Sequence, residues 1–310
     1  MKRITIFSII LLLNMSLFSK GNFYAVYVID NEVANVSCTD SLFAWQDAMN
    51  RIHNYANMNT KERVLAVGLS DSMEEWSREA VLAAVDDVNP DDHDTVLFFF
   101  AGQSGQLADS LSKKKSRYPK MLLQYGTTLE LEEVAAVLAK KHPGLMLVFA
   151  DFYDRQGSSF SEEKHVSRAN RSVVYSNYRK LFGEKRHAAV LAASCDAGNK
   201  GENGVFTHQF FKVLDECTVS GNASWQALLK KLSEPAGKLR NKACWEIRAQ
   251  KDFAAVSDVA VRKFDLPEWK DSWDENWYDY REWYDDGGWS GEFYEDDEEY
   301  YAEDEILTGE

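Results

Sequence analysis

The chain has 310 residues and a formal net charge of −15, with 45% hydrophobic and 27% charged residues. This apolar content suffices for a full hydrophobic core, and the negative charge of the C-terminal segment argues against nucleic acid as a partner. The charge is unevenly placed. Residues 265 to 310 hold 19 acids and two bases, a net of −17, which leaves about +2 for residues 1 to 264.

The N-terminus has the pattern of a signal peptide. Three residues with two basic side chains precede an apolar run from Ile4 to Phe18, which is too short for a membrane span of about 20 residues. Ser19 and Gly21 place small residues at positions −3 and −1 of a cleavage site. We therefore predict a signal peptide over residues 1–21 and an exported bacterial protein, periplasmic or secreted, without a stable membrane span. A short uncleaved anchor is the alternative.

Apolar runs alternate with amphipathic segments along the next 240 or so residues. Strands are expected over 23–30, 63–68, 94–101, 145–150 and 187–194, and an extended segment around 245–256. Helices are expected over 40–55, 72–88, 130–141, 204–216 and 224–239. The polar, basic stretches at 106–128 and 157–186 are interpreted as connections. This alternation predicts an α/β domain over residues 22–264 with a doubly wound parallel sheet.

Two of these strands end in short motifs. The strand over 94–101 continues into Gly102-Gln103-Ser104-Gly105, and the strand over 145–150 runs straight into Asp151-Phe152-Tyr153. In open α/β sheets, ligands bind at the carboxyl ends of the strands. We expect these two strand ends to lie side by side at such an edge.

From about residue 23 to about residue 260 the chain resembles the caspase-like cysteine peptidases (peptidase C14, the caspase and metacaspase clan). In that family, one strand ends in Ser-Gly-His-Gly with the catalytic His, and the next ends in Asp-x-Cys-x-x-Gly with the nucleophile. Here Gln103 stands in place of the His and Tyr153 in place of the Cys. A shift of one residue would place Phe152 there, which is not Cys either. The small-residue strand before Ser194 and the later segment Gly204-Val205-Phe206-Thr207 also resemble the family, where they build a wall of the substrate pocket.

The resemblance implies a three-layer α/β/α sandwich around a mostly parallel sheet of about six strands. It also implies a cysteine-type endopeptidase, but Gln103 has no proton to exchange near neutral pH. The phenol of Tyr153, with an ordinary pKa of about 10, is a poor nucleophile without a neighbouring base. The replaced dyad therefore predicts a catalytically inactive pseudopeptidase that binds a peptide or protein. An active C14-type hydrolase that uses non-standard residues is the alternative.

The pocket implied by the resemblance would hold a basic side chain. In metacaspase-type relatives the acid at the position of Asp151 contributes to a pocket for Arg or Lys. Asp151 and Ser194 are thus candidate peptide-binding residues, with Gln103 as an amide hydrogen-bonding group. Alternatively, Asp151 ends its strand and accepts hydrogen bonds from loop amides.

The segment 265–310 combines five Trp, many Tyr and long acidic runs. Because like charges at this density repel one another, we expect a largely disordered tail. It is either a solubilising tail or an interaction element for a basic partner, with the domain as its mount. No cofactor is predicted, although weak calcium binding by the carboxylate runs is an option without EF-hand spacing.

The four cysteines are Cys38, Cys195, Cys217 and Cys244. They form no C-x-x-C pair and no metal-site pattern, so we predict buried free thiols and no structural metal. Only Cys195 follows a strand end near the expected cleft, where it could act with His208. The family places that position on the pocket wall instead.

Overall fold

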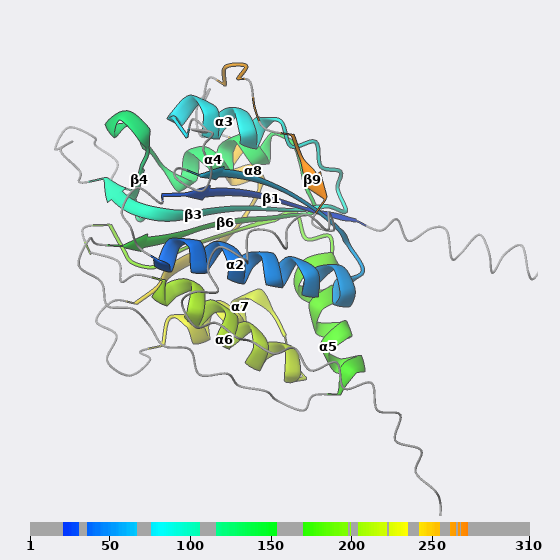
Figure 1. Cartoon of the computed structure of the whole chain (residues 1–310). Coiled ribbons are helices and arrows are strands. Elements are labelled where there is room, and N and C mark those ends of the chain that lie inside the picture. The colour runs from blue at the N-terminus through cyan, green and yellow to red at the C-terminus, as the bar shows by residue number, and fades with distance from the viewer. Residues whose placement is uncertain are drawn as a thin grey trace, which may run out of the picture. The chain divides into compact units, whose positions relative to one another are not determined.

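The computed structural model of the chain (Figure 1) describes the residues 21–30, 36–66, 76–105, 116–153, 170–197, 199, 204–221, 223–234, 242–254, 261–264, 266 and 268–271. These residues belong to one compact unit, Met1–Ser272. The second unit, Trp273–Glu310, and the predicted signal peptide up to residue 20 lie outside the described residues.

The described residues form nine strands of a mostly parallel sheet. The strands are β1 (Asn22–Ile29), β2 (Asn59–Ala66), β3 (Thr95–Gly105), β4 (Lys120–Leu122), β5 (Thr128–Leu129), β6 (Leu145–Tyr153), β7 (Ala188–Ala193), β8 (Cys244–Ala249) and β9 (Lys270–Asp271). Their order is β8-β7-β6-β3-β1-β2-β9, and β4 pairs with both β3 and β5. The five inner strands of this order are parallel to one another, whereas β4, β5, β8 and β9 pair antiparallel with their neighbours.

Helices cover both faces of the sheet (Figure 1). On one face lie α3 (Arg78–Asp86), α4 (Leu131–Ala139) and the short α8 (Lys251–Ala254). On the other lie α2 (Val36–Arg51), α5 (Arg171–Tyr178), α6 (Val205–Val219) and α7 (Trp225–Leu232). Single π-helical turns, Ile52–Ala56 and Arg179–Gly183, follow α2 and α5, and a 3-10 turn, Gln124–Gly126, lies between β4 and β5. Within the described ranges, no helix is long and apolar enough to cross a membrane.

Each face of the sheet has its own hydrophobic core. On the α2 and α6 face, the indole of Trp45 lies 5.5 Å from the ring of Phe99, 5.9 Å from Phe149 and 5.1 Å from Phe210, measured between ring centroids. Since β3 and β6 are covered on both faces, their sequences are continuous apolar runs rather than alternating ones. The three-layer α/β/α sandwich around a mostly parallel sheet is thereby confirmed.

The sheet is wider than the expected six strands because three short strands were not predicted. β4 and β5 form a hairpin within the polar stretch 106–128, and β9 lies in the segment that was expected to be disordered. Strands of two or three residues carry too little periodicity to be seen in a sequence.

Two further expectations were wrong. The stretch 157–186 is not simply a connection, because it contains α5, whose Tyr178 is buried in the core. The extended segment expected around 245–256 ends at Ala249, and α8 follows from Lys251.

Trp269 fixes the end of the described chain to the sheet. Its ring lies 4.6 Å from the guanidinium carbon of Arg63 and 5.6 Å from the ring of Tyr24. The indole Nε1 donates to the Asp87 carboxylate at 3.1 Å, and the same carboxylate oxygen pairs with Arg63 at 2.9 Å. Lys270 then pairs with Glu62 on β2. The tail expected from residue 265 is therefore not disordered in this part, which belongs to the domain.

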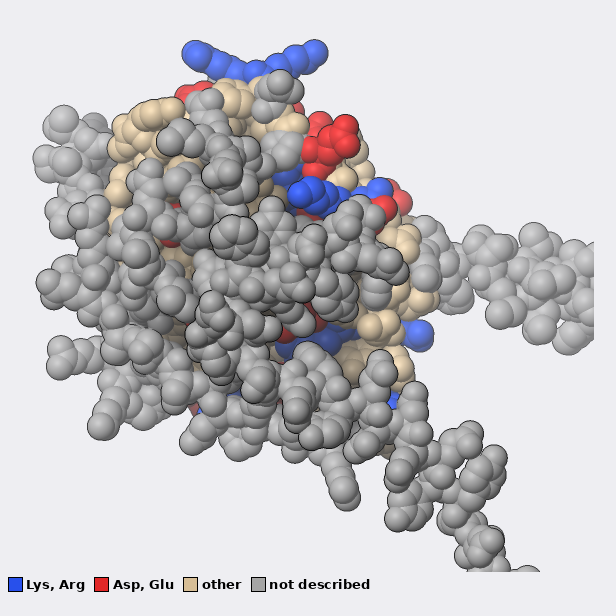
Figure 2. Space-filling view, in the orientation of Figure 1, with Lys and Arg blue, Asp and Glu red and all other residues tan. Residues whose placement is uncertain are grey.

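Several charged side chains on the described surface are paired with the opposite sign. Lys120 lies 3.2 Å from Glu130, and Lys141 lies 3.1 Å from Asp86. In Figure 2, some of the visible basic and acidic side chains lie next to one another at the upper right of the view. Exposed pairs of this kind contribute at most about 1 kcal/mol each.

We expect Trp269→Ala to lower the free energy of unfolding by about 1–3 kcal/mol, because it removes the ring packing, the cation–π contact and the hydrogen bond to Asp87. Trp269→Phe keeps a ring over Arg63 and should cost less than half as much. Urea denaturation of the two variants measures both values, and an unchanged stability in Trp269→Ala would show that the segment does not hold to the sheet.

Candidate functional site

The two strand ends singled out in the sequence are neighbours in the sheet. β3 and β6 pair in parallel along their length, and in this register Ala101 lies opposite Asp151 and Gln103 lies opposite Tyr153. Residues opposite one another in a parallel pair point to the same face, so Gln103 and Tyr153 both face α2 and α6. The prediction that the ends lie side by side is confirmed.

Tyr153 is a core residue rather than a cleft residue. Its side chain is 4% exposed, and its hydroxyl donates to the backbone carbonyl of Asp30 at 3.0 Å. Burial raises the pKa of this phenol above its ordinary value, and the neighbouring Cys38 thiol and Asp30 raise it further. The hydroxyl therefore stays protonated at neutral pH and ties the end of β6 to the end of β1.

Phe152, the residue at the alternative alignment, points to the opposite face. It is fully buried, and its ring lies 5.7 Å from that of Phe100. Gln103, in contrast, is half-buried. At these two positions, Phe152 has no nucleophilic group, and the Tyr153 hydroxyl is protonated and bonded to the Asp30 carbonyl.

Asp151 is buried beneath the start of α6. Its carboxylate accepts hydrogen bonds from the Thr207 hydroxyl at 2.6 Å and from the Thr207 backbone N–H at 3.0 Å, both on Oδ2. Thr207 is in the first turn of the helix, where N–H groups lack intrahelical partners. Burial raises the pKa of Asp151 to about 7, against the lowering effect of these hydrogen bonds. Asp151 is 2% exposed and accepts its hydrogen bonds from Thr207 of α6, not from loop amides as the alternative from the sequence expected.

Ser194 likewise bonds within the scaffold. Its hydroxyl accepts from the Phe152 backbone N–H at 2.9 Å and lies 3.2 Å from the Phe152 carbonyl oxygen, to which it donates. These contacts continue the pairing of β6 with β7 past the last residue of β7. Of the three candidate peptide-binding residues, Gln103 alone keeps a substantially accessible side chain, since Ser194 is 8% exposed.

The cysteines are free and buried, as predicted. Cys195 packs in the core on the α3 and α4 face, whereas α6, which carries His208, covers the other face. Burial raises the pKa of the Cys195 thiol to about 11, so it is not a thiolate at neutral pH. The pairing of Cys195 with His208 as a catalytic dyad has no support in this arrangement.

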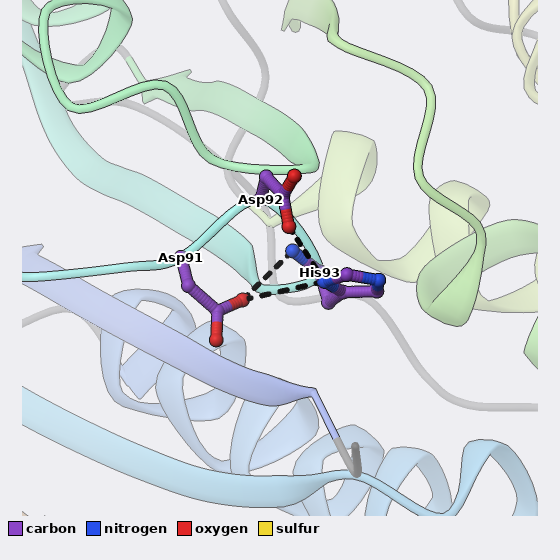
Figure 3. Close-up of side chains that lie close together, drawn as sticks. All are labelled: Asp91, Asp92 and His93. Atoms are coloured by element: carbon purple, nitrogen blue, oxygen red, sulfur yellow. Dashed lines mark hydrogen bonds and ion pairs between the residues drawn. The ribbon is translucent and has the colours of Figure 1, made fainter. Parts of the chain in front are cut away.

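One group of potential metal ligands lies at the opposite edge of the sheet, in the turn before β3 (Figure 3). Asp92 lies 2.6 Å from the Nδ1 of His93, and Asp91 accepts from the His93 backbone N–H at 2.8 Å. The Asp92 carboxylate also pairs with Lys185, which lowers the pKa of Asp92. Because the two carboxylates already bind His93 and Lys185 and the turn is exposed, we assign no metal to it.

A cavity of about 680 Å³ opens along the edge strand β8. It is lined by Arg117, Asp196, Ser233 and residues 242–247. None of the candidate residues Gln103, Asp151, Tyr153 and Ser194 lines it, so the cavity is separate from the ends of β3 and β6.

The sequence interpretation missed the partners of these residues. Thr207 was noted only as part of a helix entry, and Asp30 only as the end of a strand. Thr207 lies three residues after the N-cap Gly204, where a backbone N–H has no partner within the helix and favours a negative charge, and this signal could have linked Thr207 to a buried acid. No local signal points from Tyr153 to Asp30, because 123 residues separate them.

No family model and no curated protein matches the chain. Among solved structures it is similar to caspase-1 from Spodoptera frugiperda, with 11% identity and a TM-score of 0.37 over 74% of this chain and 87% of that chain. It is also similar to a secreted C11 cysteine protease from Bacteroides thetaiotaomicron, with 6% identity and a TM-score of 0.34 over 76% of this chain and 68% of that chain. Likenesses of this size establish neither a shared family nor a shared activity.

The raised pKa of Asp151 makes stability depend on pH. Because its pKa is about 7 in the folded chain and about 4 in the unfolded chain, the stability it contributes is complete below pH 4 and is lost as the pH rises through 7. Asp151→Asn keeps an acceptor for Thr207 and carries no charge. We expect this variant to gain about 2–4 kcal/mol relative to the wild type between pH 4 and pH 8.5.

Urea denaturation of both proteins across this pH range is the measurement. Glu62, whose pKa burial also raises to about 7, contributes equally to both proteins and cancels in the difference. Parallel stability curves for wild type and variant would contradict the assignment.

Proposed function

We propose that this chain is an exported caspase-fold pseudopeptidase, which holds a peptide or protein at the ends of β3 and β6 without cleaving it. The observation that supports this most directly is Tyr153. At the position of the nucleophile, the phenol is buried, has a raised pKa and donates to the Asp30 carbonyl. Its partner in the register, Gln103, cannot act as a base.

The chemistry of cysteine peptidases requires a thiolate and a base that later protonates the leaving amine. Neither group is present at this pair. Gln103 offers an amide N–H and a carbonyl oxygen at the rim of the same edge, which are suitable for hydrogen bonds to a peptide backbone. The binding contribution therefore falls to Gln103, while Asp151 and Ser194 act by holding α6 and β7 in place.

The test of inactivity uses the chain without residues 1–21 and a fluorogenic peptide library weighted toward Arg and Lys before the cleaved bond. We expect no turnover by the wild type. We expect measurable turnover by the double variant Gln103→His/Tyr153→Cys, because the scaffold places the two positions opposite one another, and neither single variant should show it.

Thermal unfolding of each variant is the control, because Tyr153→Cys removes a large core side chain. Wild-type turnover that persists through repurification and disappears in Tyr153→Phe would overturn the proposal in favour of the active-hydrolase alternative.

Binding is tested separately by titrating labelled Arg- and Lys-containing peptides and following fluorescence anisotropy. We expect Gln103→Ala to weaken binding about 5- to 10-fold, as the loss of one hydrogen bond would do. Asp151→Asn, whose side chain is buried, serves as the matched control and should bind as the wild type does. If Asp151→Asn weakens binding and Gln103→Ala does not, Asp151 and not Gln103 binds the basic side chain.

A second candidate function has one observation in its favour. Trp269 and β9 attach the chain to strand β2 just before residue 273, where the acidic aromatic segment begins. A chain ending at Ser272 keeps this attachment and lacks the segment. If it loses capture of a basic peptide that the full chain binds, the segment and not the strand edge is the interaction element.

A further inference from the structure

Asp94 is a buried carboxylate at the beginning of β3. It is 1% exposed, and its Oδ1 accepts from the backbone N–H of Asn22 at 2.5 Å. The Asn22 side-chain amide lies 3.2 Å from the same oxygen, and the Asp91 backbone N–H donates to Oδ2 at 2.9 Å. Among the described residues, no Lys, Arg or His forms an ion pair with Asp94.

Asp94 differs in this respect from the acidic residue two positions before it. In the turn shown in Figure 3, the neighbouring Asp92 pairs with both His93 and Lys185. Asp94 has only neutral donors, and burial raises its pKa, assisted by the charge of Asp91. A buried carboxylate without a cation lowers stability, and a positive charge on its nearest donor would offset that cost.

The nearest donor is the backbone nitrogen that would become the N-terminus. The sequence places small residues, Ser19 and Gly21, at positions −3 and −1 of a cleavage site, so the bond to be cut joins Gly21 to Asn22. In the uncleaved chain the Gly21 carbonyl oxygen accepts from the Asn59 backbone N–H at 3.3 Å, and cleavage removes this hydrogen bond while it leaves the Asn22 nitrogen beside Asp94. The backbone nitrogen of Asn22 is thus both the atom that cleavage would release and the donor nearest to the buried Asp94 carboxylate.

We propose that removal of residues 1–21 creates an α-ammonium group on Asn22 that forms a buried ion pair with Asp94 and anchors the first residue of β1. The leader-removing peptidase hydrolyses the Gly21–Asn22 bond with one water, which leaves a carboxylate on Gly21 and an amino group on Asn22. That amino group takes up a proton at neutral pH. It keeps the donor position 2.5 Å from Asp94 and gains the positive charge.

The pair would act on the centre of the sheet. β1 lies between β2 and β3, and the residue next to Asn22, Phe23, starts the pairing with Thr95 on β3. A charge-assisted hydrogen bond is about twice as strong as a neutral one. The mature chain therefore has a charged anchor at the amino edge of the sheet, where the uncleaved chain has a neutral hydrogen bond.

The first experiment exports the full-length chain in a bacterial host and sequences the N-terminus of the purified protein. We expect the mature chain to begin at Asn22. A mature N-terminus at any other residue, or an uncleaved one, overturns the proposal.

The second experiment compares the mature chain carrying a free amine with the same chain acetylated at Asn22. Acetylation keeps one N–H and removes the charge. We expect it to lower Tm by about 3–8 °C, and the shift to vanish in Asp94→Asn. Asp91→Asn is the matched control, because it removes a nearby negative charge but keeps the backbone N–H that donates to Asp94, and there the shift should persist. An equal shift in Asp94→Asn, or none in the wild type, overturns the ion pair.

A third measurement does not require that Asp94→Asn folds. Because the ion pair holds the proton on the amine, acylation of the Asn22 α-amine at pH 7 should be at least about tenfold slower in the folded wild type than in urea. Equal rates would contradict the pair.

Discussion

The pairing of β3 with β6 is the constraint on which the rest of this structure depends. Both strands are covered by helices on both faces, so a slip of one residue would exchange every side chain between the two cores. The register that results places position 103 opposite position 153 whatever residues stand there. The core and not the chemistry of the site therefore fixes this geometry.

The sequence predicted the parts of the fold that rest on continuous burial. The apolar runs that became β1, β3, β6 and β7 have few other ways to fold, and the positions of Gln103 and Tyr153 follow from where two of them end. What the sequence could not show was the direction of each side chain past a strand end. Tyr153 turned into the core and Asp151 under α6, because their partners come from residues 123 and 56 positions away in the chain.

Two buried acids divide the work at the two edges of the sheet. Asp151 holds the first turn of α6 at the carboxyl edge through Thr207, and Asp94 holds the first residue of β1 at the amino edge. Both have raised pKa values because burial is only partly offset by hydrogen bonds. These two carboxyl groups therefore connect segments that are distant in the sequence, and they do so through hydrogen bonds.

The short pairing of β9 with β2 has a mechanical consequence. Lys270 and Asp271 run antiparallel to β2 at the outer side of the sheet, with Trp269 behind them on Arg63. A pulling force applied from residue 273 onward meets the two residue pairs of β9 and the contacts of Trp269 with Arg63, Tyr24 and Asp87 before it reaches the inner strands. Such a joint yields by peeling, one pair after another, whereas the parallel strands beyond it would have to shear all their hydrogen bonds together. Tension on that end of the chain would release β9 first and leave the sheet intact.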